Sequence, residues 1–145
     1  MDEVSDRAAP DAASAEVDRV LRALRPHVEI VDGLAVSRFE PRPEHRGRPG
    51  WLHGGFAATV LDHVCAGAAV FALGRPVVTG RLDLRYPNPV PLDGGPYRVQ
   101  AEPGQARGRM VKVMGFILDG DGRRLVEARS LFVGIDSALS LDPPL

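Results

Sequence analysis

The longest apolar stretch of the sequence, residues 54–73, contains no proline, and it restricts the possible folds more than any other feature. Gly74 and Pro76 follow it, and a glycine with a proline soon after is typical of a helix C-terminus. An apolar stripe repeats at intervals of three and four residues: Ala57, Val60, Leu61, Val64, Ala68 and Phe71. A second stripe is almost entirely small: Gly55, Thr59, Asp62, Ala66 and Ala69. These stripes predict a long helix that is buried on most of its sides.

Asp62 is unusual in this helix because it is a carboxylate among apolar and small residues, and a buried charge needs a reason. His53, Gly54 and Gly55 stand where the helix begins. N–H groups at a helix N-terminus stabilise a bound anion, and glycine allows it to approach closely. Residue chemistry alone leaves other interpretations open. The charge of Asp62 could be stabilised by a helix N-terminus, the sole role of the two glycines could be to permit tight packing, and His53 could be a turn residue.

Strand patterns lie on both sides of the helix. Residues 28–39 alternate around Asp32 and Gly33, a two-residue hairpin turn, and residues 40–50 form a loop rich in proline and glycine. This loop is longer than a connection needs, which suggests a binding role. Four further strands are predicted at 78–86, 97–102, 110–118 and 125–135, with a hairpin turn at 119–122. The order predicts an α+β fold in which one curved antiparallel sheet wraps around the long helix.

The two ends of the chain are predicted to be flexible segments outside a single domain. Residues 1–13 are charged and alanine-rich, which predicts a flexible leader. A short amphipathic helix is predicted to begin after Ser14 and to end at Pro26. We expect a single domain over residues 14–135 and a flexible tail over residues 136–145.

Composition excludes several classes of function. The chain has 145 residues, 44% hydrophobic and 26% charged, as expected for one globular domain, and its net charge of −1 gives no case for nucleic-acid or membrane-surface binding. We find no apolar run expected to cross a bilayer and no signal-peptide core. The single cysteine, Cys65, excludes an intramolecular disulfide and is expected to be an inert core residue. No metal-ligand spacing appears, so no metal is expected. The lack of a signal-peptide core and of a membrane-spanning run makes a cytoplasmic protein the expectation.

Four pieces of sequence carry a family resemblance: residues 47–55, 58–62, 78–82 with 86–91, and 121–122 with 127–128 and 132–133. Together with the order of strands and helix, they resemble a hotdog-fold acyl-CoA thioesterase of the phenylacetate-degradation type, near the mitochondrial thioesterase superfamily branch. The resemblance spans about residues 28–135. It implies the hotdog fold and hydrolysis of an acyl-CoA thioester to a free acid and CoA. CoA is then part of the substrate, and no separate cofactor is expected.

The resemblance also implies catalytic roles by position. Asp62 matches the helix carboxylate that acts as general base or nucleophile, and Gly54 matches the residue whose N–H polarises the thioester carbonyl. His53 matches the residue that shapes the turn and places the substrate. Thr79 matches a Ser or Thr that hydrogen-bonds the attacking water or the carboxylate. Many relatives carry Asn or Gln six residues before the histidine, where this chain has Gly47.

Substrate binding adds further candidates. Gly55 and Asn88 belong to the motifs of the resemblance and are candidates for substrate binding. Trp51 is a third candidate and is either a lid over the acyl site or a core residue. Arginines bind phosphate well, so two groups could hold the phosphates of CoA. They are Arg81 with Arg85, and Arg107 with Arg109 and Lys112. The second group resembles the CoA-contacting turn of the family.

Helix geometry predicts a dimer. Gly54 and Asp62 are eight residues apart, or about 12 Å at 1.5 Å per residue. A reacting carbonyl sits about 3 Å from both groups, so two antiparallel helices from two chains are expected to form each site. We therefore expect a homodimer, with two dimers pairing into a tetramer.

Two alternative functions stay open: an acyl-CoA-binding module without catalysis, and a hotdog dehydratase, for which His45 is out of register. The sequence also leaves open which acyl group the substrate carries, and whether the thioester is one of CoA or of a carrier protein.

Overall fold

A computed structural model describes residues 26–136 of the chain. The predicted leader, the predicted helix after Ser14 and residues 137–145 of the predicted tail lie outside the described residues. The sheet begins with β1 (Glu29–Val31) and β2 (Leu34–Phe39), and the long helix α2 (Gly54–Leu73) follows. The chain then forms β3 (Val77–Arg85), β4 (Tyr97–Pro103), β5 (Met110–Leu118) and β6 (Arg124–Gly134).

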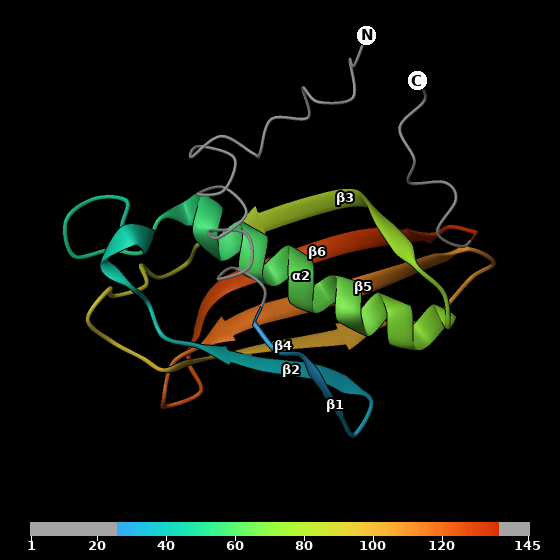
Figure 1. Ribbon diagram of the computed structural model, residues 1–145, viewed down its shortest axis with the longest axis horizontal. Coiled ribbons are helices and arrows are strands. Elements are labelled where there is room, and N and C mark those ends of the chain that lie inside the picture. The colour runs from blue at the N-terminus through green and yellow to red at the C-terminus, as the bar shows by residue number, and fades with distance from the viewer. Residues whose placement is uncertain (1–25, 137–145) are drawn as a thin grey trace, which may run out of the picture.

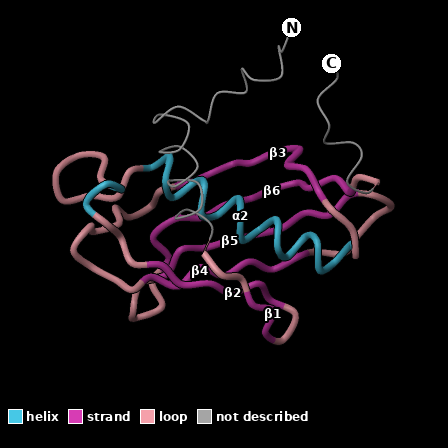
Figure 2. Tube along the Cα trace, in the orientation of Figure 1, coloured by secondary structure: helices cyan, strands magenta, loops and turns pink. Residues whose placement is uncertain are grey.

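The six strands form one antiparallel sheet in the order β1-β2-β4-β5-β6-β3. Figure 1 shows α2 lying across the hollow side of this curved sheet, between β3 and β2, and Figure 2 shows the same wrapping along the Cα trace. The expected α+β hotdog architecture is confirmed. The order also places β3 and β1 at the two edges, and β3 is much the longer of the two.

Helix α2 has the ends that the sequence predicts. His53 is its N-cap, and Gly74 ends it in the left-handed conformation at φ 67°, with its N–H donating to the Val70 carbonyl. The predicted apolar stripe is wrong at one position, Phe71, whereas burial of Ala69 agrees with a helix that is buried on most of its sides. Phe71 is 55% exposed because it stands in the last turn, beyond the last buried residues of the helix.

The apolar character of α2 follows from its place in the fold. By its length of 20 residues and by a mean hydropathy of 1.7 over an 18-residue window, it could cross a membrane, so the expectation that no apolar run is long enough is wrong. Its buried side chains belong to one core with side chains from the sheet, such as Val99, Val113 and Phe132. That packing accounts for the composition of the helix.

Strand β3 contains an extra residue at Gly80. Thr79 pairs with Phe132 and Arg81 with Leu131, so Gly80 has no partner of its own and forms a β-bulge. The strict alternation predicted for residues 78–86 is therefore wrong across this glycine. Leu82 packs against the core on the helix side, and the bulge brings Thr79 to that side as well, although regular alternation would place it with Arg81 on the other face.

The predicted loop at residues 40–50 contains a short 3-10 helix, η2 (Pro43–His45). The predicted strands after the helix are correct within one residue at each end. The turn between β1 and β2 has positive φ at both Asp32 and Gly33, as a two-residue hairpin requires.

Candidate active site

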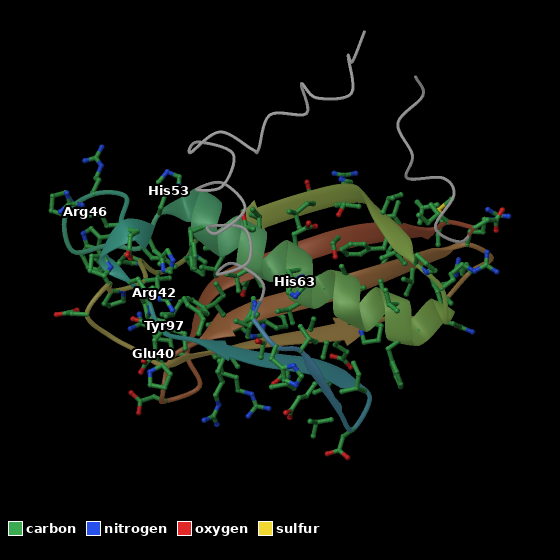
Figure 3. The ribbon with its side chains drawn as sticks, viewed as in Figure 1. Glu40, Arg42, Arg46, His53, His63 and Tyr97 are labelled. Carbon is green, nitrogen blue, oxygen red and sulfur yellow. The ribbon has the colours of Figure 1, made fainter. Side chains whose placement is uncertain are left out.

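The turn that opens α2 is one half of the candidate site (Figure 3). The His53 Nδ1 atom accepts a hydrogen bond of 2.9 Å from the Gly55 N–H and so caps the helix. A neutral imidazole that accepts at Nδ1 carries its proton on Nε2. Within residues 26–136 the Gly54 N–H has no hydrogen-bond partner, and Gly54 is exposed. This N–H can therefore donate to an oxyanion at the helix N-terminus.

His45 supports this turn from the side of the loop. Its carbonyl accepts the His53 N–H at 2.7 Å, and its ring stacks on Phe56 with 3.9 Å between centroids. Its Nδ1 accepts the Arg42 N–H at 3.0 Å. Burial lowers the pKa of His45 below its ordinary value of 6.5, and the charge of Arg42 lowers it further while Glu44 opposes. The lowered pKa keeps the ring neutral, so Nδ1 can accept that bond.

Gly47 lies directly against the same turn. A Cβ atom on Gly47 would lie 3.2 Å from the Cα of His53, which is tighter than ordinary packing. Its N–H donates to the Trp51 carbonyl at 3.0 Å. The position at which many relatives carry an amide side chain is thus adjacent to His53, and a Cβ there would require the His53 backbone to shift by a few tenths of an ångström.

Tyr86 makes a contact with the start of α2 that was not predicted from the sequence. Its hydroxyl donates to the Gly54 carbonyl at 2.7 Å and so ties the chain just after β3 to the first residue of α2. Burial raises the pKa of Tyr86, which keeps the hydroxyl protonated as a donor. Tyr86 belongs to one of the segments of the family resemblance, but the reach of its side chain across the fold is not visible in a local pattern.

Asp62 and Thr79 form the other half of the site. The Thr79 hydroxyl donates to Asp62 Oδ1 at 2.8 Å, and Asp62 is half-buried. Within residues 26–136 the hydrogen-bond partner of Asp62 is Thr79, so no helix N-terminus in this part of the chain binds the carboxylate. No hydrogen bond from this part of the chain reaches Oδ2, which leaves that oxygen available for a water molecule or a substrate.

Cys65 lies one turn after Asp62 and is fully buried. Burial raises the pKa of its thiol to about 12, and the charge of Asp62 adds to this rise while a hydrogen bond with Ser130 opposes it. The thiol is therefore neutral at physiological pH, in agreement with an inert core residue.

The two halves are separated along one continuous helix. Gly54 begins α2 and Asp62 lies eight residues later, which corresponds to about 12 Å of helix. The structure thus brings His53, Gly54 and Gly55 together at one place and Asp62 with Thr79 at another. It does not bring the proposed oxyanion donor and the proposed acid of one chain to a common substrate atom.

Trp51 and Asn88 line one cavity, but they are held differently. Trp51 is 43% exposed, so it is not a core residue. The Asn88 side chain donates to the Arg124 carbonyl at 3.0 Å and accepts from Arg123 Nη2 at 2.6 Å. Asn88 therefore ties the segment after β3 to the hairpin between β5 and β6.

The arginine candidates do not converge on Asp62 or Gly54 within one chain. Arg81 pairs with Asp83 at 2.8 Å and lines a cavity of about 630 Å³ together with Lys112. Arg109 pairs with Asp136 at 3.4 Å.

Arg107 closes the turn between β4 and β5 through its backbone hydrogen bonds to Met110, while Arg85 lies opposite Glu127 on β6.

Over residues 26–136 no group of three or more His, Cys, Asp or Glu side chains could hold a metal ion.

Comparison with known sequences identifies a family. Residues 49–126 match the thioesterase superfamily. Acyl-coenzyme A thioesterase THEM4 of Xenopus laevis is 35% identical over 99 residues, which are 68% of this chain and 44% of that protein. The protein of the same name from Rattus norvegicus is 34% identical over 70% of this chain and 43% of its own length. The chain spans less than half the length of these curated relatives.

Solved structures agree with this match. The crystal structure of a thioesterase superfamily protein is 32% identical, with a TM-score of 0.68 over 73% of this chain and 54% of that chain. Zebra fish thioesterase superfamily member 2 gives a TM-score of 0.69 over 83% of this chain and 97% of its own, at 19% identity. At that identity the second likeness shows the fold alone.

Proposed function

The chain belongs to the thioesterase superfamily, and from that premise we propose that it hydrolyses an acyl-CoA thioester to a free acid and CoA. The relatives named as acyl-CoA thioesterases support the substrate class. The observation that carries the proposal is the Asp62–Thr79 pair, in which one carboxylate oxygen is held by a hydroxyl and the other is available. A carboxylate oriented in this way is suited to act on a thioester carbonyl.

Two routes use the same residues. As a general base, Asp62 takes a proton from water while the water oxygen attacks the carbonyl carbon. As a nucleophile, Asp62 attacks that carbon itself to form a mixed anhydride, which water then hydrolyses. In both routes negative charge develops on the carbonyl oxygen, and the Gly54 N–H stabilises it. The tetrahedral intermediate then collapses with cleavage of the C–S bond, which yields the acid in the first route and the anhydride in the second. The CoA thiolate leaves and takes up a proton, which in the first route is the one that Asp62 removed from water.

The proposed site is shared by two chains. About 12 Å of helix separates Gly54 from Asp62, so the Gly54 that serves an Asp62 belongs to the partner chain. Strand β3 supports this arrangement because it is a long edge strand, and such an edge can pair with the same edge of a second copy. Thr79 stands on β3 beside Asp62, so an interface along this edge would pass close to the acid.

Release of thiol from a panel of acyl-CoA substrates tests the proposal, with aryl, short, medium and long acyl chains. Wild-type protein should release CoA, and Asp62→Asn should reduce kcat by at least about a hundredfold, since this change removes the base or nucleophile. Equal rates in the two proteins would remove Asp62 from the mechanism. Acyl-CoA binding without any thiol release by the wild type would favour the binding module, and hydration of an enoyl thioester would favour the dehydratase.

A matched pair of variants tests the oxyanion donor. Gly54 is the first residue of α2, where proline fits without loss of a helix bond, and His53 already has the extended backbone that precedes a proline. Gly54→Pro removes the N–H, whereas Gly54→Ala keeps it and places a Cβ at an ordinary 3.6 Å from the Tyr86 ring. Gly54→Pro should lower kcat about a hundredfold or more, and Gly54→Ala should change it little. Similar rates in the two variants would exclude this N–H as the donor.

A further inference from the structure

The hydrogen bond between Tyr86 and Gly54 joins the end of an edge strand to the start of the central helix. Tyr86 directly follows β3, and Figure 1 shows β3 running alongside α2 and ending near the first turns of that helix. The same strand carries Thr79, whose hydroxyl binds Asp62. One strand and the residue just after it therefore contact α2 at both functional positions of the chain, the acid and the oxyanion donor.

The peptide group between Gly54 and Gly55 is held at both of its polar atoms. Its carbonyl oxygen accepts the Tyr86 hydroxyl at 2.7 Å, and its N–H donates to His53 Nδ1 at 2.9 Å. A peptide group is planar, so hydrogen bonds at its two ends fix its orientation. His53 also accepts the Ala57 N–H at its carbonyl, at 3.1 Å. The N–H groups of Gly55 and Ala57 are thus occupied, while that of Gly54 has no hydrogen-bond partner within residues 26–136.

The direction of the free Gly54 N–H depends on this held peptide group. Only the φ and ψ angles of Gly54 lie between its N–H and its carbonyl, and glycine restricts these angles less than any other residue does. Gly54 therefore needs contacts from elsewhere in the fold to keep its N–H in one direction. The Tyr86 side chain supplies them, because a Cβ on Gly54 would lie 3.6 Å from its ring carbons and from its hydroxyl oxygen.

We propose that Tyr86 is a positioning residue for thioester hydrolysis, in which its hydroxyl and the His53 ring together orient the Gly54–Gly55 peptide group so that the Gly54 N–H points at the thioester carbonyl oxygen. This inference rests on the proposed function, since it adds a residue to the same site. Tyr86 transfers no proton and acts only through Gly54. A donor that is aligned before the reaction stabilises the oxyanion without reorganisation, and a small displacement loses much of that effect.

Tyr86→Phe tests this role because it removes the hydroxyl and keeps the ring. Tyr86 is 48% exposed, so the variant is expected to fold. Its kcat for an acyl-CoA should fall about tenfold, because the oxyanion donor loses its alignment, while KM should change less than about twofold.

Tyr97→Phe is the matched control. Tyr97, which Figure 3 labels, is the only other tyrosine of the chain, and its hydroxyl also donates to a backbone carbonyl, that of Pro91, at 2.6 Å. Loss of this bond should lower Tm as loss of the Tyr86 bond does, but it should leave kcat at the wild-type value. An equal loss of kcat in Tyr97→Phe would overturn the proposal, since a general loss of stability would then explain both results.

Combined variants show whether Tyr86 acts through the Gly54 N–H. Gly54→Pro removes this N–H and keeps the carbonyl that Tyr86 contacts, so adding Tyr86→Phe should lower kcat by less than about twofold more. In a Thr79→Val background, Tyr86→Phe should lower kcat about tenfold, as in the wild type, because Thr79 acts on the acid and not on the donor. Equal losses in all three backgrounds would overturn the proposal.

Hydrogen exchange provides a readout that needs no substrate. The Gly55 N–H belongs to the held peptide group, and its exchange with deuterium can be followed by NMR of the 15N-labelled full chain. Tyr86→Phe should speed this exchange about 3- to 10-fold, as the loss of one neutral hydrogen bond allows, and Tyr97→Phe should leave it unchanged. Unchanged exchange in Tyr86→Phe would show that its hydroxyl does not hold the peptide group and would overturn the proposal.

The two readouts separate this inference from the proposed hydrolysis. Thiol release by the wild type with an unchanged kcat in Tyr86→Phe would overturn the role of Tyr86 and leave the hydrolysis in place. An absence of thiol release by the wild type, together with faster exchange at Gly55 in Tyr86→Phe, would overturn the hydrolysis and support Tyr86 as the residue that orients Gly54.

Discussion

The Thr79 hydroxyl donates to Asp62 Oδ1 at 2.8 Å, and the bulge at Gly80 turns the Thr79 side chain toward the helix that carries this acid. Glycine suits the bulge, since a Cβ at this position would lie 3.3 Å from the Leu131 carbonyl oxygen. An irregularity of one residue in an edge strand thus decides whether the carboxylate has a partner. Bulges often re-aim a side chain beside an active site.

Thr79→Val should lower kcat more than it raises KM. A hydrogen bond to a charged group contributes about 1.5–3 kcal/mol, so loss of the hydroxyl is expected to reduce kcat about 10- to 100-fold. Thr79→Ser keeps the hydroxyl and should retain most of the activity. Thiol-release kinetics on both variants check this, and unchanged kcat in Thr79→Val would show that the bond to Asp62 has no part in the reaction.

Two inactive variants should restore activity when they share a dimer. A mixed dimer of Asp62→Asn with Gly54→Pro has one site with both defects and one site that is intact, if each site takes Asp62 and Gly54 from different chains. Random mixing of equal amounts should then give roughly a quarter of wild-type activity. Thiol release by the unselected co-expressed mixture measures this, and mixed dimers isolated through two different affinity tags should reach roughly half of wild-type activity. A site within one chain would give no recovery.

Ala58 should be sensitive to size. If Gly54 of one helix faces Asp62 of an antiparallel partner, the twofold axis passes midway between them, at Ala58, which is small and half-buried. Ala58→Trp should therefore give a monomer in sedimentation velocity that has lost its activity but keeps its helical circular dichroism. Val70→Trp is the control, because Val70 is 42% exposed and lies three turns farther along α2. An active dimer of Ala58→Trp would contradict this crossing point.

The course of α2 was predictable because its signals are local. The absence of proline between Gly54 and Leu73, and the Gly74–Pro76 stop, define the helix, and repeating apolar positions identify most of its buried side. Exposure of Phe71 was not predictable in the same way, since it depends on where the packed core ends rather than on helical spacing.

Contacts between segments that are distant in the sequence could not be predicted from it. A lone glycine within a strand pattern can indicate a bulge, but the pattern alone does not say whether Gly80 shifts the register. The position of Arg38 opposite Arg98 depends on the pairing of β2 with β4, which are separated by a helix and another strand. The Tyr86 bond to Gly54 likewise depends on how β3 lies relative to α2.

Gly115 should tolerate no side chain while Cys65 is present. A Cβ on Gly115 would lie 2.6 Å from Cys65 Sγ and 3.2 Å from Leu61 Cδ2. Gly115→Ala is therefore expected to lower the free energy of unfolding by about 1–3 kcal/mol, as overpacking of a core does.

The double variant with Cys65→Ala should lose less than the sum of the two single changes, because the sulfur that clashes is gone. Urea unfolding measures all three proteins. Gly120→Ala, where a Cβ meets nothing within 4 Å, should change little. Strict additivity of the first two changes would contradict the clash.

His45 should give the folded protein a dependence on pH below 6.5, its ordinary pKa. Burial lowers this pKa in the folded state, so the unfolded chain takes up a proton first as the pH falls. The contribution of the neutral ring is fully present above 6.5 and is lost as the pH falls from 6.5 through the lowered folded-state pKa. Protonation also removes the acceptor for the Arg42 N–H and so loosens the loop that supports His53.

Between about pH 7.5 and about pH 5, the free energy of unfolding in urea should therefore fall more for the wild type than for His45→Gln. Parallel pH profiles for the two proteins would show that His45 does not couple protonation to folding.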